Sequence, residues 1–132
     1  MTDHLEGTFE VTSWNEEAAA GLEQAGKVTR AKIGQRFAGG VTAETVFDTV
    51  MAYRDDGTAD FLGYQRVVGR VGGREGSFVL QSIGTFDGKE ARAATSVVPD
   101  SGKGDLAGLR GSGTSVAPIG PSGTYTLDYD LG

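Results

Sequence analysis

Long stretches of this chain alternate between apolar and charged residues with a period of two, and this pattern constrains the fold more than any other feature. Between residues 59 and 71, one set of alternate positions holds apolar or small residues and Gln65, whereas the other set holds Asp60, Arg66 and Arg70. Successive side chains of a β-strand point to opposite faces, so this period indicates strands with one buried and one solvent-facing side. The pattern therefore predicts an all-β fold.

Short turn sequences separate the alternating stretches, such as "DDGT" after Arg54 and "GG" at residues 72–73. Gly and Asp tolerate the positive φ angles that tight hairpins require. Long strands joined by hairpins form an antiparallel meander, and closing the meander into a barrel removes its exposed edges. We therefore predict a single domain over residues 1–132, an eight-stranded antiparallel closed β-barrel of the up-and-down type. Its strands are expected at residues 6–14, 27–39, 41–54, 58–71, 74–86, 89–98, 109–117 and 122–131.

Two segments do not alternate, and we expect short helical structure there. "NEEAAAGLEQAG" at residues 15–26 predicts a helix of about two turns that ends at glycine. "GKGDLAGL" at residues 102–109 predicts a single turn. Trp14 would then lie where the first strand ends, either as an anchor at the barrel rim or as a surface on which a ligand stacks.

Charge and composition exclude several classes of partner. The net charge is −6 and no basic stripe is present, so we expect no nucleic-acid partner. There is no cysteine, no apolar signal core and no apolar run of membrane-spanning length, so we expect a cytoplasmic protein that does not insert into a membrane. His4, the only histidine, is expected in a frayed terminus, so neither a histidine-based metal site nor a catalytic triad is expected, and no cofactor.

The stretch "GSFVLQSIGTFDG", residues 76–88, places small residues in the middle of a strand. If its Phe-rich face points inward, Ser82 and Gly84 stand between large apolar residues and leave space that a packed barrel would fill. The outer face would then expose Val79 and Ile83, which the 15–26 segment or another subunit could cover. Association into a homo-oligomer is therefore left open.

The inward faces of all strands carry neutral side chains only, which limits the chemistry of the interior. Phe47, Met51, Phe61, Phe78 and Phe86 would form apolar walls, and Gln35, Tyr53, Gln65 and Ser82 would supply polar groups. These nine residues are the expected ligand-binding set.

Three functions are compatible with such an interior. The first is a binding barrel for a small apolar or amphipathic ligand. The second is a cofactor-free isomerase or cyclase, with Tyr53 and Gln65 as candidate catalytic residues. The third is a structural or oligomeric module with a filled barrel, in which Tyr53 and Gln65 bond to each other or to buried water. The residues alone do not decide whether the protein is an enzyme.

Several stretches carry a resemblance to a known family: "VTRAKIGQRF", "YRDDGTADFLGYQRVVGRVGGREGSFVLQSIGTFDG" and "GKGDLAGLRGSG". Over residues 5–131 the chain resembles a bacterial domain-of-unknown-function family, numbered three-two-two-four, with an allene-oxide-cyclase-like barrel. The resemblance implies an eight-stranded barrel but no established activity. It also implies that relatives often carry an acidic residue where this chain has Gln65 and a histidine where it has Ser82. If those two act as an acid–base pair in relatives, this chain has lost both.

Overall fold

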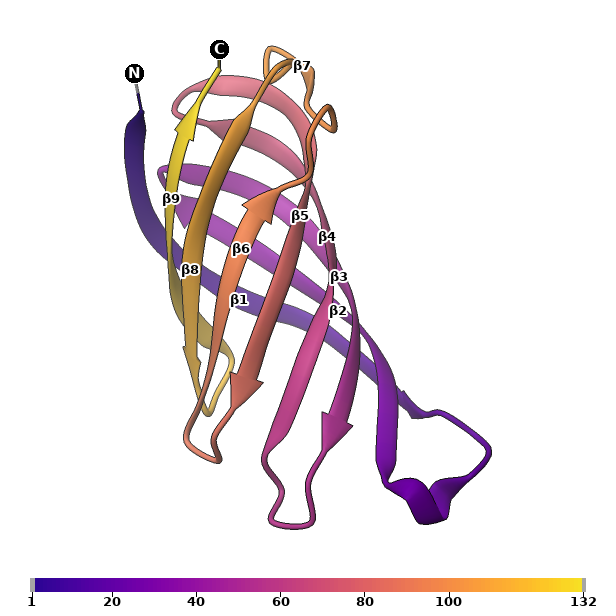
Figure 1. Cartoon of the computed structure of the whole chain (residues 1–132). Helices are drawn as coiled ribbons and strands as arrows, with labels where there is room; N and C mark the ends of the chain where they lie inside the picture. Colours follow the sequence, from indigo (N-terminus) through magenta and orange to yellow (C-terminus); the bar gives the residue numbers. More distant parts are fainter. Residues whose placement is uncertain (1, 132) are drawn as a thin grey trace.

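A computed structural model describes residues 2–131, and most of that chain is β-structure (Figure 1). Strands β2 to β5 coincide with alternating stretches of sequence, and along most of their length every second side chain is buried or half-buried. The elements are β1 (Asp3–Ala18), the short 3₁₀ helix η1 (Glu23–Ala25), β2 (Lys27–Gly39), β3 (Val41–Tyr53), β4 (Ala59–Val71), β5 (Arg74–Phe86), β6 (Glu90–Val97), β7 (Lys103–Gly104), β8 (Arg110–Pro118) and β9 (Ser122–Asp130).

The strands form a closed antiparallel barrel in which neighbours in the sheet are also neighbours in the chain. Eight long strands pair in the order β1, β2, β3, β4, β5, β6, β8 and β9, and β9 pairs with β1 to close the barrel. The short β7 adds a ninth strand that pairs with the start of β5. The predicted all-β, eight-stranded barrel is therefore confirmed.

The helix expected over residues 15–26 is wrong. Residues 15–18 continue β1 and pair with β2, with Glu16 opposite Ala31, and only the single 3₁₀ turn η1 follows. The two acidic residues in "NEEA" suggest a helix terminus, but pairing with the long β2 satisfies the backbone of this segment, and tertiary pairing overrides weak local preference. The segment therefore lies beside β2 and does not cover Ile83, which stays 58% exposed on the outer face of β5.

One end of the barrel is closed by packed apolar side chains. Residues 103–109 form β7 and a series of tight turns, and these place Leu106 and Leu109 in the interior at 0% and 1% exposure. They join a core cluster that includes Val71, Phe78 and Tyr129. The single helical turn expected over residues 102–109 is therefore wrong: β7 and hydrogen-bonded turns stand there and plug the barrel.

Tyr125 on β9 fastens the β2–β3 hairpin across β1, the strand that lies between β9 and β2. Its hydroxyl accepts a hydrogen bond from the Val41 N–H at 2.8 Å and lies 2.8 Å from the Ala38 carbonyl oxygen, to which it donates. Gly7 allows this approach, because a Cβ there would lie 2.4 Å from the Tyr125 hydroxyl oxygen. The closed end is therefore stabilised by hydrogen bonding as well as by apolar packing.

Among the described residues, there is no helix with the length and apolar character that crossing a membrane requires.

Candidate functional site

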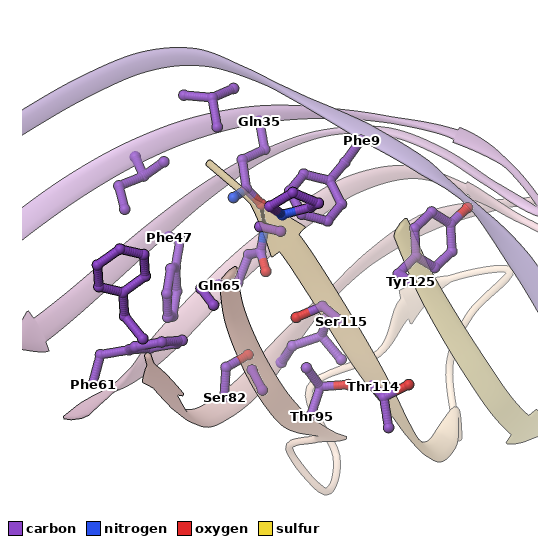
Figure 2. A pocket seen from close by; sticks show the side chains of 18 of the residues that line it. Phe9, Gln35, Phe47, Phe61, Gln65, Ser82, Thr95, Thr114, Ser115 and Tyr125 are labelled. Atoms are coloured by element: carbon purple, nitrogen blue, oxygen red, sulfur yellow. Dashed lines mark hydrogen bonds between the residues drawn. The ribbon is translucent and has the colours of Figure 1, made fainter. Parts of the chain in front are cut away.

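The other end of the barrel contains a cavity of about 390 Å³. It reaches the surface beside Trp14 and Ile119, which are 51% and 74% exposed. The residues around it come from all eight long strands and from the β8–β9 turn (Figure 2). They are Phe9, Val11, Trp14, Ile33, Gln35, Phe37, Phe47, Met51, Tyr53, Ala59, Phe61, Gln65, Leu80, Ser82, Phe86, Ala91, Ala93, Thr95, Thr114, Ser115, Ala117, Pro118, Ile119, Gly120, Tyr125, Thr126 and Leu127.

The cavity exists because its two sides carry side chains of different size. Large apolar residues of β1 to β4 form one wall, in which Phe9 stacks on Phe37 at 5.4 Å and Phe47 meets Phe61 edge to face at 6.3 Å. The opposite wall, on β6 and β8, presents only small side chains to the cavity, namely Ala91, Ala93, Thr95, Ser115 and Ala117. Small side chains on two adjacent strands leave the middle of the barrel open.

A group of polar side chains lies at mid-depth in the cavity. The Gln65 side-chain nitrogen donates to the Gln35 side-chain oxygen at 2.7 Å and to the Thr45 hydroxyl at 2.8 Å. Ser82 and Thr95 face each other across β5 and β6, and within residues 2–131 their hydroxyls form no hydrogen bond. Figure 2 shows Gln65, Ser82, Thr95 and Ser115 around one space. Polar groups of this kind orient a ligand inside an apolar pocket.

A carboxylate, Glu16, lies at the mouth of the barrel on the inner side of β1. It accepts hydrogen bonds from the Tyr53 hydroxyl at 2.6 Å, the Thr29 hydroxyl at 2.7 Å and the Trp14 indole N–H at 3.0 Å. The Lys27 ammonium lies over the Tyr53 ring, 4.6 Å from the ring centroid, and makes a cation–π contact. The expectation that no charged group faces inward is therefore wrong at the rim.

A β-bulge explains why Glu16, which was expected in a helix, faces the interior. Val11 pairs with Gln35 and Ser13 pairs with Gly34, so Thr12 is an extra residue in β1. After one extra residue, side chains that would have pointed inward along the rest of the strand point outward, and the reverse. Trp14 and Glu16 consequently turn toward the interior, and Trp14 lies within β1 instead of at its end.

These contacts perturb two pKa values at the mouth. Burial, together with the hydrogen bond to Glu16 and its negative charge, raises the pKa of Tyr53 to about 12. Burial by itself would raise the pKa of Glu16, but the hydrogen bonds from Tyr53, Thr29 and Trp14 outweigh it, so that pKa is lowered. Near neutral pH the pair is thus a neutral phenol that donates to an ionised carboxylate.

The structure brings most of the predicted site residues together. Of the nine expected ligand-binding residues, all except Phe78 line the cavity: Gln35, Phe47, Met51, Tyr53, Phe61, Gln65, Ser82 and Phe86. Phe78 is 3% exposed and packs with Val71 and Leu106 in the core at the closed end. It lies near that end because it directly follows Gly76 and Ser77, the β5 residues that pair with β7, so it supports the fold and does not line the cavity.

Gly84 does not provide the open space that its size suggests. A Cβ at Gly84 would lie 2.6 Å from the tip of the Phe61 ring and 2.2 Å from the Arg92 carbonyl oxygen. Phe61 is the direct cross-strand partner of Gly84, and its ring covers the glycine. Aromatic rings commonly cover glycines in this way in sheets. The space lies instead over β6, where Ala93 follows as the next partner.

Tyr53 and Gln65 do not form a pair. Tyr53 lies opposite Ala59, and Gln65 is six residues further along β4, which separates the two by about 20 Å. Each has its own partners, Glu16 for Tyr53 and Gln35 with Thr45 for Gln65. The mutual hydrogen bond considered for a filled barrel is therefore absent among the described residues.

His4 is ordered and lies outside the cavity. It pairs with Asp128 within the sheet, and its ring nitrogens lie 2.6 Å from an Asp128 oxygen and 2.7 Å from a Glu6 oxygen. The expected frayed terminus is wrong for this residue. In the part of the chain that the structure describes, no three His, Asp or Glu residues are arranged to hold a metal ion.

The fold and the site together define an up-and-down β-barrel that is plugged at one end and hollow at the other. The chain belongs to the family described as "Protein of unknown function (DUF3224)", whose model matches residues 5–129. It is similar to the crystal structure of a protein of unknown function from this family in Shewanella oneidensis MR-1, with 29% sequence identity, a TM-score of 0.84, and coverage of 100% of this chain and 99% of that one. None of the curated proteins compared matches the chain. The likeness to allene oxide cyclases stays a prediction.

Proposed function

We propose that this barrel binds a small, largely apolar molecule that carries a neutral polar group. The observation that carries the proposal is the cavity itself, with an aromatic wall on one side and unpaired hydroxyls at mid-depth. Ligand pockets of roughly 300–1,000 Å³, mostly apolar with a few convergent polar groups, are typical of small-molecule sites. Of the residues that line this one, none is charged.

The cavity geometry favours binding over the two alternatives. A cofactor-free isomerase or cyclase needs a proton donor or a proton acceptor matched to the working pH. The best candidate, Tyr53, directs its proton to Glu16 and has a pKa raised to about 12. A structural module with a filled barrel would not leave about 390 Å³ beside an exposed mouth.

Filling the cavity from the small-residue wall tests the proposal. Ala93 on β6 lines the cavity, whereas the next residue, Ala94, is exposed on the outer face. Ala93→Leu should therefore occupy ligand space, and Ala94→Leu is a control with the same chemical change on the same strand. The neutral dye N-phenyl-1-naphthylamine, whose fluorescence rises in apolar surroundings, serves as the probe.

We expect the dye to bind the wild type, to bind Ala93→Leu at least about tenfold more weakly, and to bind Ala94→Leu as it binds the wild type. A tenfold change corresponds to about 1.4 kcal/mol, the range expected for removing a small apolar contact surface. If both variants bind the dye as tightly as the wild type, the dye does not enter the cavity and the proposal loses its support.

A further inference from the structure

The hydrogen-bond directions within the group formed by Gln35, Thr45 and Gln65 follow from one hydroxyl. Thr45 has a single hydroxyl proton, and its oxygen lies 3.1 Å from the Gln35 backbone carbonyl, which can only accept. Thr45 therefore accepts from Gln65, so the Gln65 atom 2.8 Å away is its nitrogen. That nitrogen also lies 2.7 Å from a Gln35 side-chain atom, which must be the oxygen.

The opposite arrangement of the two amides is less favourable. If both amide groups were flipped, Thr45 would donate to Gln65 and leave its contact with the Gln35 carbonyl without a proton. The flipped group makes two hydrogen bonds, and the observed one makes three. Each additional hydrogen bond stabilises the folded state, so the arrangement with three hydrogen bonds is favoured.

This network leaves one donor and one acceptor unused. Both protons of the Gln65 amide are taken, so its oxygen remains as an acceptor. The Gln35 oxygen is taken, so its NH₂ group remains as a donor. Neither atom has a hydrogen-bond partner within residues 2–131, and neither is sealed from the cavity. The Gln65 side chain is 5% exposed, so packing by its neighbours fixes the direction in which its amide group points.

We propose that Gln35 and Gln65 select a ligand group in which a hydrogen-bond donor stands beside an acceptor, as in a primary amide or a lactam. This inference rests on the proposed binding function and specifies the polar end of the ligand. The Gln65 oxygen accepts from the ligand N–H, and the Gln35 amide donates to the ligand carbonyl. The aromatic wall formed by Phe9, Phe37 and Phe47 takes the apolar body of the same molecule.

The same site disfavours a charged ligand. A carboxylate placed at Gln65 would meet its side-chain oxygen, and of the lining residues none could neutralise the charge. Transferring an ion into an apolar site without a partner is far more costly than transferring a neutral amide. The selected class is therefore neutral.

Three probes with the same naphthalene body and different polar groups test this selection: 2-naphthamide, methyl 2-naphthoate and the 2-naphthoate ion. Isothermal titration is carried out on the wild type, Gln65→Met and Gln35→Met. Gln81→Met is the matched control, because Gln81 lies on the outer face of β5. Circular dichroism checks that each variant is folded, and Gln35→Met provides a second test because Gln35 is less buried than Gln65.

We expect 2-naphthamide to lose about tenfold in affinity in both cavity variants and less than twofold in Gln81→Met. Methyl 2-naphthoate has a carbonyl but no donor, so it should change less than threefold in Gln65→Met and should weaken, like the amide, in Gln35→Met. The naphthoate ion should bind the wild type most weakly. If the amide and the ester bind the wild type but respond alike to Gln65→Met, the selection by Gln35 and Gln65 is wrong while the binding function stands. If no probe binds the wild type, the proposed function fails and this inference fails with it.

Discussion

Tyr53→Phe isolates the hydrogen bond at the mouth of the barrel. The substitution removes one of the three donors to the Glu16 carboxylate and leaves the ring, and the Lys27 contact on it, in place. A hydrogen bond to a charged group contributes about 1.5–3 kcal/mol when well buried. Tyr53 and Glu16 are only half-buried and Glu16 keeps two other donors, so we expect a loss of about 1 kcal/mol at pH 7.5.

The pH dependence of that loss is the sharper test. The pKa of Tyr53 in the folded protein is raised from 10 to about 12, so the folded state holds this proton more tightly than the unfolded state. The contribution of the hydroxyl is complete below pH 10 and is lost as the pH rises from 10 to 12. Two pKa units correspond to about 2.7 kcal/mol, and solvent screening at the rim reduces this to about half. The stability difference between wild type and variant should therefore fall to about zero near pH 11.5.

Urea unfolding followed by far-ultraviolet circular dichroism measures this difference at intervals from pH 7.5 to 11.5. Tyr64→Phe is the control, because Tyr64 is 52% exposed on the outer face of the neighbouring strand. Comparing variants cancels the titration of the other tyrosines and lysines. A difference between wild type and Tyr53→Phe that stays constant over this range would refute the assigned proton position and the raised pKa.

Two further predictions concern the other end of the barrel. Tyr125→Phe leaves the buried Val41 N–H without its acceptor and should lower the free energy of unfolding by about 1–3 kcal/mol, measured by urea unfolding. A change below about 0.5 kcal/mol would contradict the stabilising role of the Tyr125 hydroxyl. His4 donates hydrogen bonds to the Glu6 and Asp128 carboxylates, and these raise its pKa above 6.5. The contacts therefore stabilise the fold below pH 6.5, and their contribution is lost as the pH rises through the folded-state pKa. An NMR titration of the His4 ring should show the raised pKa, and Asp128→Asn should lower it; a midpoint at or below 6.5 in the wild type would contradict the pairing.

Much of the fold could be predicted because β2 to β5 alternate without interruption. In β3, every charged residue falls on the outer face, and hairpin turns at residues 54–58 and 72–73 fix the register of its neighbours. Burying an unpaired charge is costly, so the charged side of each strand has one orientation only. That is why Gln35, Phe47 and Gln65 lie on the inner face that the sequence predicts. Ser82 follows instead from the Phe-rich face of β5, because residues 76–86 carry no charge on either face.

The mouth of the site could not be predicted, because it depends on one extra residue in β1. "VTSWNEEA" contains no glycine or other signal of a bulge near Thr12, and pairing with β2 alone reveals it. The bulge turns the residues that follow it to the other face and so brings Glu16 onto Tyr53. The signal that was available lay in β6, where "EARAATSV" alternates small inward residues with Arg92 and Ser96. Small side chains on a whole strand predict open space more reliably than one glycine does.

The open interior lowers the stability of the fold, and this gives Ala93→Leu a second readout. Residual cavities destabilise cores by about 24 cal/mol per Å³, so 390 Å³ corresponds to an upper limit of about 9 kcal/mol, as large as the total stability of many domains. Contact with water at the mouth reduces that figure, but the three carbon atoms added at Ala93 should still stabilise the protein by about 1–2 kcal/mol. The same change should weaken probe binding, whereas Ala94→Leu on the outer face should do neither. A gain in stability at the expense of binding is the behaviour of a site kept open for a ligand. If Ala93→Leu destabilises the fold by more than 1 kcal/mol, the space beside β6 does not accept added side-chain volume, and the assignment of this wall as ligand space would be wrong.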